Sequence, residues 1–466
     1  MPSTFSGINI ALRAVLTNQR AMDVISHNVA NTNTPGYTRQ EATLVTAEPW
    51  TEPGFVHGSI PGQLGTGVQI SQIRRYATSF FDRRIRGESQ TLGRWQVTRD
   101  ALEQISVMFT EPSETGLAAA MDQFWSSWQD LASNPESMAA RETVIQDSKN
   151  MTTLFNTFHS QLANQQKDID HQLDGYAQKV NESASELARL NTTIAKVESI
   201  GDHPNDLLDR RDVVLDRLAE IADIQFAIGE NDATTVAIGG HSLVMGSQSV
   251  ALQVSPDPAN YNLRKLTWAD DGSPVAISDG EMAGVLHVRD SVIPDLQSKL
   301  DTLAQSLISS VNTLHKAGYA LDGTTTGLDF LQGTGARDIA VAFDDPALVS
   351  AAVNASAIGD GNQALAISAL QDQTIVGGQA TAADSFRTLI TSLGLDAQHA
   401  QTMTQNRSLL VDHLKQSKES QAGVSLDEEA VNLIRFQRGF QAAARAMNVI
   451  DEMLNQVVNT LGMVGR

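Results

Sequence analysis

The 466-residue sequence predicts a mainly α protein with an inserted β domain, in which N-terminal and C-terminal parts together form a long antiparallel helical rod. Three observations predict this class. Apolar residues recur every three or four positions near both ends, as in helices with one buried seam. The same period persists through residues 142–199, whereas a period of two, typical of strands, replaces it between 221 and 278. We expect the terminal helices to form a coiled coil on assembly.

The first helical segment, within residues 6–40, carries an apolar seam of Ile8, Leu12, Val15, Met22 and Val29. The last helical segment, within 423–461, carries a matching seam of Leu433, Phe436, Phe440, Met447, Leu454 and Val458. Amphipathic helices that pack on a globular core show the same pattern. Two such helices at opposite ends favour pairing with each other and with other copies, because a terminal helix without contacts frays. We therefore predict that both seams form a subunit interface.

Residues 49–67 are rich in Gly and Pro and indicate a loop or hairpin, and 68–73 read as a short strand. A helical pattern begins near residue 78, with a break at 111–115. This stretch is dense in arginine: Arg74, Arg75, Arg83, Arg84, Arg86, Arg94 and Arg99. These side chains either form a solvated helix face with ion pairs four residues apart, or contact an acidic surface of a neighbouring subunit.

The pattern over 142–199 predicts a helix of about 85–90 Å. A helix of this length must bury its seam against other long helices, and we expect the segments 291–316 and 381–421 to be its partners. Just before it, the aromatic residues Phe124, Trp125 and Trp128 mark a helix face anchored in a core.

Between 221 and 278, short alternating runs separated by Gly and Asp turns predict an antiparallel β domain. The predicted domains are a terminal coiled-coil domain with its adjoining loop (1–75 with 423–466), a helical rod (76–220 with 284–322 and 373–422), the β insertion (221–283) and a loop-rich insertion (323–372).

Composition narrows the function classes. A net charge of −21 disfavours nucleic-acid binding, which needs concentrated Lys and Arg. The absence of cysteine excludes disulfides and thiolate metal sites. The sequence has no apolar run of the roughly 20 residues that a membrane span needs. Residues 1–7 lack the basic region of a secretory signal peptide.

No phosphate-binding loop, zinc helix or nucleophile elbow is present in the sequence, so we predict no enzyme activity, no cofactor and no metal. Asp206, Asp209 and Asp212 are spaced to lie on one helix face beside arginines. Helix-dipole and ion-pair roles are favoured there over a metal site. Residues 270–272, Asp-Asp-Gly, fit a β-turn better than a calcium loop.

Residues 28–40, Asn-Val-Ala-Asn-Thr-Asn-Thr-Pro-Gly-Tyr-Thr-Arg-Gln, resemble the N-terminal motif of bacterial flagellar axial proteins, and 426–437 resemble the closing motif of that family. The Tyr-Thr-Arg-Gln ending is most similar to the hook-associated protein 1 branch, the hook–filament junction proteins. An internal motif at 205–212 supports that branch. The motif positions are Asn28, Asn31, Asn33, Pro35, Gly36, Tyr37, Arg39, Gln40, Asp206, Asp209, Asp212, Asp427, Glu428, Glu429 and Gln437. Gly439 departs from the branch pattern and lowers local helix propensity by roughly 1 kcal/mol.

The resemblance implies a structural protein that forms a ring or helical layer between hook and filament. Its implied partners are other copies of itself, the hook protein, the second junction protein (hook-associated protein 3) and a flagellar export chaperone, with no nucleic acid and no membrane. It also implies export to the flagellum without a cleaved signal peptide. Two alternatives stay open: a rod or hook protein of the same family, and a secreted adhesin that displays 221–278 or 323–372 on a flagellar-type scaffold.

Overall fold

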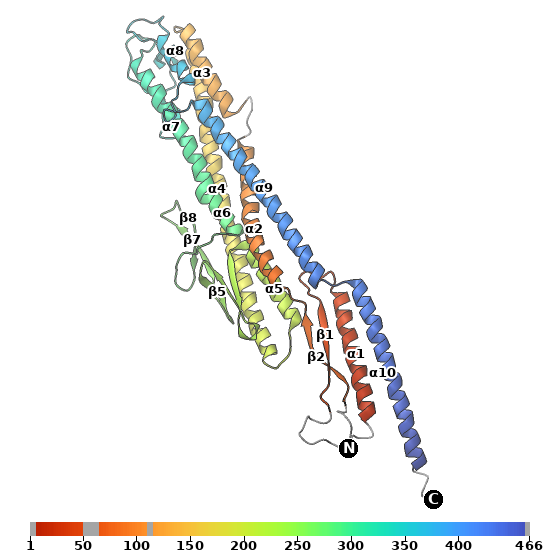
Figure 1. The fold of residues 1–466 in the computed structure, drawn as a ribbon. Coiled ribbons are helices and arrows are strands. Elements are labelled where there is room, and N and C mark those ends of the chain that lie inside the picture. Colours follow the sequence, from red (N-terminus) through yellow and green to blue (C-terminus); the bar gives the residue numbers. More distant parts are fainter. Residues whose placement is uncertain (1–5, 50–64, 110–114, 462–466) are drawn as a thin grey trace.

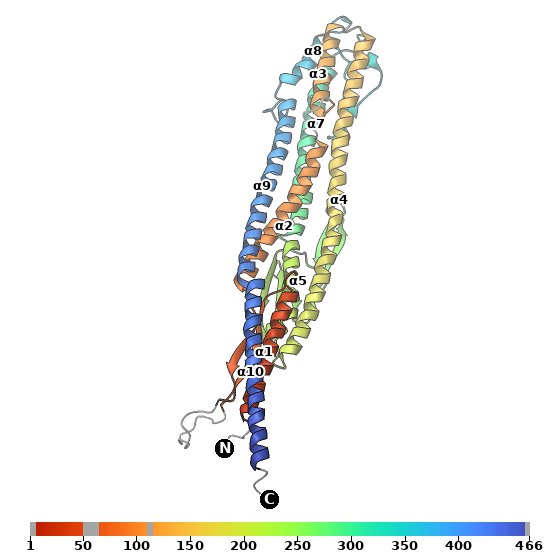
Figure 2. The same ribbon diagram turned by 90° about the vertical axis from the view of Figure 1, so that its right-hand side faces the viewer.

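The computed structural model describes residues 6–49, 65–109 and 115–461. The molecule is elongated, and one helix, α4, runs along most of its length (Figures 1 and 2). The two ends of the described chain lie together at one tip, and α3 and α8 lie at the other. The fold class predicted from the sequence is confirmed. The Gly/Pro-rich loop prediction falls largely on 50–64 and the predicted helix break largely on 110–114, both outside the described residues.

The rod is built around α4 (Met138–Glu198), a single helix of 61 residues. Its first turn is capped by Ser137, whose side chain accepts a hydrogen bond from the Ala140 N–H. Helices α3 (Leu117–Ser133), α5 (Asn205–Ile221) and α7 (Ile293–Ala317) pack on it. Apolar side chains along α4 are therefore covered at successive levels by different helices.

Helix α9 (Ala382–Ala422) packs chiefly on α2 (Ser79–Met108). The expectation that this segment pairs with α4 is wrong. The seam of α4 is already covered by α3, α5, α7 and strands of the insertion, which leaves α2 as the surface for α9. Two specific contacts fix that packing: Trp95 meets His399 edge to face, and Arg407 pairs with Glu88 at 2.7 Å.

The β insertion holds a four-stranded antiparallel sheet of β3 (Ile224–Ile228), β4 (Thr234–Ile238), β5 (His241–Met245) and β6 (Gln248–Ser249), in that order. A separate hairpin joins β7 (Leu252–Asp257) to β8 (Leu263–Trp268). The chain then returns to the rod through α6 (Glu281–His287) and a π-helical turn (Val288–Val292) that leads into α7.

At the far tip, the segment after α7 is packed, although its regular structure is sparse. It contains the short pair β9 (Leu331–Gln332) and β10 (Ala340–Val341), a 3₁₀ turn (Pro346–Leu348), α8 (Asn362–Ser368) and a second 3₁₀ turn (Ala369–Asp372). Buried Trp128 and Phe330 meet edge to face beside His315.

His315 is fully buried and neutral in this tip. Its Nδ1–H donates to the Leu328 carbonyl at 2.8 Å, and its Nε2 accepts from the Ser350 N–H at 2.9 Å. A second proton on Nε2 would face that N–H. Burial lowers the pKa of His315 from 6.5 to about 4.

Near the other tip, β1 (Gln40–Thr46) pairs with β2 (Val68–Arg75) in an antiparallel ribbon with a bulge between Thr43 and Leu44. The sequence predicted β2 but not β1. A continuous apolar core extends through the rod and the β insertion, whereas the described residues of the terminal region form only a small cluster around Ala21, Val24 and Ala42. The terminal region therefore depends on other interactions for its position.

Candidate functional site: the terminal helix pair and its polar joint

Helices α1 (Ser6–Ala30) and α10 (Leu426–Leu461) lie side by side at the tip that holds the chain ends (Figures 1 and 2). Gly439 faces α1, because a Cβ at this position would be 2.6 Å from the Asn18 Oδ1. Helix α10 continues unbroken through Gly439. The residue that lowers helix propensity therefore makes room for the Asn18 side chain of α1.

The predicted seam residues lie at intermediate depth or at the surface of the single chain. Ile8, Val15 and Met22 of α1 and Phe436, Phe440, Met447 and Leu454 of α10 are half-buried, while Leu12, Val29, Leu433 and Val458 are exposed. The buried positions of α1 are different ones: Ala11, Thr17, Ala21, Val24, Ile25 and Asn28. This buried face mixes the apolar Val24 and Ile25 with small and polar side chains, and the predicted seam does not include it.

The outer surface of the helix pair is rich in exposed apolar side chains. Between 38% and 68% of each is accessible in Leu12, Leu16, Val29, Val431, Leu433, Ile434, Val449, Met453, Val457 and Val458. Exposed apolar side chains in such number are typical of protein–protein contact sites. We call these residues the apolar face.

A network of polar side chains, the polar joint, connects the helix pair to the rod. It consists of Asn28, Tyr37, Thr38, Arg39, Gln40, Arg75, Asp206, Asp209, Asp212, Glu428 and Glu429. Its centre is the buried Asn28, which exchanges two hydrogen bonds with the backbone of Gln40, at 2.9 and 3.0 Å. The Asn28 Oδ1 also accepts from the Tyr37 hydroxyl at 2.7 Å, and its Nδ2 donates to Glu429 at 3.2 Å. One side chain thus connects α1, β1 and α10.

Arg39 holds the start of α10. Its Nε donates to the Glu429 Oε1 at 2.7 Å and its Nη1 to the Glu428 Oε2 at 2.8 Å. The Glu429 side chain is only 2% exposed, whereas that of Glu428 is 62% exposed. The backbone N–H of Arg39 also donates to the carbonyl of Ala422, the last residue of α9. Both sides of the α9–α10 turn are therefore attached to one residue.

On the rod side, α5 presents its aspartates to the same strands. Asp209 accepts from the Thr38 N–H at 3.0 Å and from Arg75 at 2.8 Å, and Asp212 pairs with Arg75 at 2.6 Å. Asp206 accepts from the Gln40 side chain at 2.8 Å. The ion-pair interpretation of the two inner aspartates is confirmed. All four of their carboxylate oxygens have donors, since the Asp212 Oδ1 accepts from Arg86, so they offer no free set of metal ligands.

The two inner carboxylates differ in protonation energetics. Burial raises the pKa of Asp209 in spite of its contacts with Thr38 and Arg75. Burial also acts upward on Asp212, but Arg75, Arg86 and Arg211 together outweigh it and lower its pKa. The pKa of Tyr37 is raised by burial and by the nearby carboxylates, Asp206 first, so its hydroxyl remains a hydrogen-bond donor.

Other motif positions lie beside the joint or away from it. Gly36 has a φ of 79°, and a Cβ there would overlap the Val213 side chain of α5. Asn31 donates to the His27 carbonyl within the turn after α1. The remaining motif residues, Asn33, Pro35, Asp427 and Gln437, are exposed.

The sequence interpretation missed Arg75 and Arg86 as parts of this network. Arg86 is buried and Arg75 is nearly so, with 3% and 12% of their side chains exposed, and both pair with aspartates of α5 in the same chain. For these two arginines, neither a solvated face nor a contact with another subunit is right. Arg84, which pairs with Glu88 four residues on, does lie on a solvated face. The density of arginines in an acidic chain was the signal, but their partners lie far away in sequence.

Family models match three parts of the chain: the flagellar hook-associated protein FlgK helical domain at 102–331, the flagellar basal body rod FlgEFG protein C-terminal model at 415–461, and the flagella basal body rod protein model at 8–38. Flagellar hook-associated protein 1 of Bacillus subtilis is 28% identical over the full length of both chains. Over its full length, the chain is similar to flagellar hook-associated protein 1.

More distant relatives show the same similarity. The Salmonella typhimurium protein of the same name is 22% identical over 97% of this chain and 99% of its own length. The flagellar hook junction protein FlgK of Burkholderia pseudomallei has a similar fold, with a TM-score of 0.65 at 14% identity over 73% of this chain and 100% of that one. The two family models of flagellar basal body rod proteins match the terminal helices α1 and α10 with the end of α9. The hook-associated model matches much of the helical rod of this molecule and its β insertion. Across the described residues, no helix has the length and apolar character to cross a bilayer.

Proposed function

We propose that this protein is the structural layer at the junction between the flagellar hook and filament, and that it assembles through the apolar face of the α1–α10 pair. One observation carries the assembly mode: the exposed apolar side chains lie on a helix pair that the polar joint fixes to a long rod. Each chain thus holds its apolar face in a fixed orientation relative to the rod, which suits repeated contacts between identical subunits. In the proposed layer, the terminal helices lie on the inside, and the rod and the two insertions project outward.

The partners proposed for the two sides of the layer are the hook protein and the second junction protein, hook-associated protein 3. Before export, an apolar surface of this size would promote aggregation. We therefore propose that an export chaperone covers α10 in the cytoplasm, and that the chain leaves through the flagellar export channel without cleavage of a signal peptide. The role is mechanical, and no catalytic step is assigned to the chain.

Deletion of the gene tests the junction role. Cells should carry bare hooks under the electron microscope and release flagellin into the medium. Intact filaments would refute the junction role, while absent hooks would place the protein further inward, as a rod or hook component.

Complementation with variants tests the assembly surface. Phe440→Glu or Met453→Glu should leave the rod folded and abolish filament attachment, and Phe440→Glu should also abolish chaperone binding. Leu365→Glu is the matched control, because Leu365 is a 50% exposed apolar residue at the opposite tip. Normal filament attachment in Met453→Glu would show that the apolar face is not the contact surface, and normal attachment in Phe440→Glu would refute the predicted seam.

A further inference from the structure

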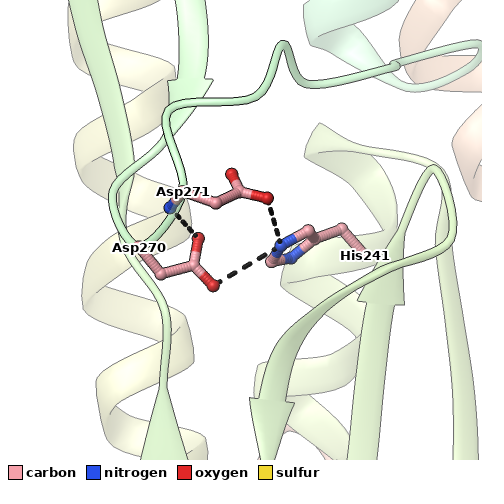
Figure 3. A group of neighbouring side chains, drawn as sticks. All are labelled: His241, Asp270 and Asp271. Atoms are coloured by element: carbon pink, nitrogen blue, oxygen red, sulfur yellow. Dashed lines mark hydrogen bonds and ion pairs between the residues drawn. The ribbon is translucent and has the colours of Figure 1, made fainter.

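A histidine and two aspartates converge in the β insertion, and none of them belongs to the polar joint (Figure 3). His241 begins β5 after the Gly239–Gly240 turn, and Asp270 and Asp271 lie in the turn after β8. These turns belong to different sheets. The His241 Nε2 lies 3.5 Å from the Asp270 Oδ2 and 3.7 Å from the Asp271 Oδ2.

Each side chain is held so that one ligand atom is left over. The Asp270 Oδ1 accepts from the Asp271 N–H at 3.0 Å, and the Asp271 Oδ1 accepts from the Ser273 N–H at 2.8 Å. The two remaining oxygens, both Oδ2, point to the imidazole (Figure 3). The imidazole is stacked on the buried Trp268 with ring centroids 4.2 Å apart and planes 19° apart. Backbone hydrogen bonds and ring stacking therefore set the three orientations before any ligand arrives.

The distances between the His241 nitrogen and the two carboxylate oxygens distinguish a direct hydrogen bond from metal coordination. A direct N–H···O hydrogen bond would bring nitrogen and oxygen to about 2.7–3.2 Å, and both observed distances are longer. Ligands about 2.0–2.2 Å from a tetrahedral zinc ion are about 3.3–3.6 Å from one another. Octahedral magnesium, with ligands near 2.0–2.1 Å, would bring adjacent ligands to about 2.9 Å. Both observed gaps exceed the magnesium spacing; the 3.5 Å gap lies within the tetrahedral zinc range and the 3.7 Å gap lies just above it.

We propose that His241, Asp270 and Asp271 bind one zinc-type divalent cation, with water completing the coordination. The bound ion would join the β4–β5 turn to the turn after β8, and so clamp the four-stranded sheet to the β7–β8 hairpin. The imidazole ligand favours Zn²⁺ and Co²⁺ over Mg²⁺ and Ca²⁺. The other ring nitrogen, Nδ1, is buried without a hydrogen-bond partner among the described residues, so Trp268 stacking takes the place of the usual second hydrogen bond.

Titration of the metal-free full-length protein with Zn²⁺ tests this site by calorimetry, and Co²⁺ titration reports tetrahedral geometry by its visible absorption. We expect about one equivalent per chain, with affinity at least about tenfold lower in His241→Gln and in the Asp270→Asn/Asp271→Asn double variant. His413→Gln is the control, since His413 is an exposed histidine on α9. Hydrogen exchange should show that Zn²⁺ slows amides in 239–241 and 270–273 of the wild type only.

Equal Zn²⁺ affinity in the wild type and His241→Gln would overturn the proposal. So would Mg²⁺ binding as tight as Zn²⁺, which would indicate a diffuse acidic surface. Failure of the wild type to bind any of these ions would leave only an ion pair between protonated His241 and the carboxylates. Because every readout is made on the monomer, none depends on the junction role.

Discussion

Replacement of Glu429 by glutamine is the sharpest perturbation of the polar joint. Both carboxylate oxygens of Glu429 accept hydrogen bonds, one from the Arg39 Nε and the other from the Asn28 Nδ2. A glutamine amide has one acceptor oxygen, so its NH₂ group must face one of these donors. The variant therefore loses a charge-assisted hydrogen bond and leaves a buried donor without a partner.

The size of the effect follows from burial. Loss of a hydrogen bond to a charged group costs about 1.5–3 kcal/mol, and an unpaired buried donor adds about 1–3 kcal/mol. Arg39 keeps its contact with Glu428 at 2.8 Å, which limits the loss to about 2–4 kcal/mol. Glu428→Gln is the matched control, because its side chain is 62% exposed and the exposed pair contributes less than about 1 kcal/mol.

Native-state hydrogen exchange on α10 measures both variants as changes in the free energy of local opening. Glu429→Gln should lower protection along α10 and the end of α1 while α4 stays unchanged. Equal effects of the two substitutions, or a larger one for Glu428→Gln, would refute the reasoning that burial makes Glu429 the holding contact.

Three further predictions concern stability. His315 takes up a proton below about pH 6.5 in the unfolded chain, but only near pH 4 in the folded chain. The free energy of unfolding should therefore fall by roughly 3 kcal/mol as the pH drops from 6.5 to 4, and level off below pH 4. Urea titrations at several pH values would measure this fall. Gly439→Ala should lower the hydrogen-exchange protection of α10 by about 1–3 kcal/mol, because the added methyl group overpacks against Asn18. In an Asn18→Ala background the same substitution should raise that protection by up to about 1 kcal/mol, because only the gain in helix propensity remains. An equal response in both backgrounds would contradict the contact between Gly439 and Asn18. Arg75→Met should cost about 3–5 kcal/mol in chemical denaturation, because it leaves the buried Asp209 without its cation and removes one of the arginines that pair with Asp212. Arg74→Met, at a 57% exposed position, should cost less than about 1 kcal/mol. Similar losses in both variants would count against the buried network.

Periodicity was sufficient for the elements whose character is local. The pattern over 142–199 predicted α4 almost to its ends, and the alternation at 224–228 predicted β3. Pairing was not predictable in the same way, since the seam of α9 would fit α4 or α2 equally well and only the complete set of helices decides between them. Strand β1 was missed because the residues 40–46, Gln-Glu-Ala-Thr-Leu-Val-Thr, give too short an apolar alternation.

In the candidate site, too, the motif residues could be predicted from the sequence but their contacts could not. The motif residues Asn28, Tyr37 and Arg39 were identified by resemblance, but their contacts with one another and with Glu429 depend on the tertiary fold. His241 and Asp270 are 29 positions apart in sequence, with no motif spacing between them, so only the folded insertion brings them together.

The separation of the joint's partners along the chain has a consequence for the order of folding. Asn28 and Glu429 are 401 positions apart. Closing a loop of that length in an unfolded chain costs about 2 kcal/mol more than closing one of 40 residues, and it requires the last helix to be present. Once the rod has formed, α2, α5 and α9 hold both ends at one tip, and that entropic cost has already been met. A chain that folds in stages would therefore complete the α1–α10 helix pair last, after the rod that orients this pair has formed.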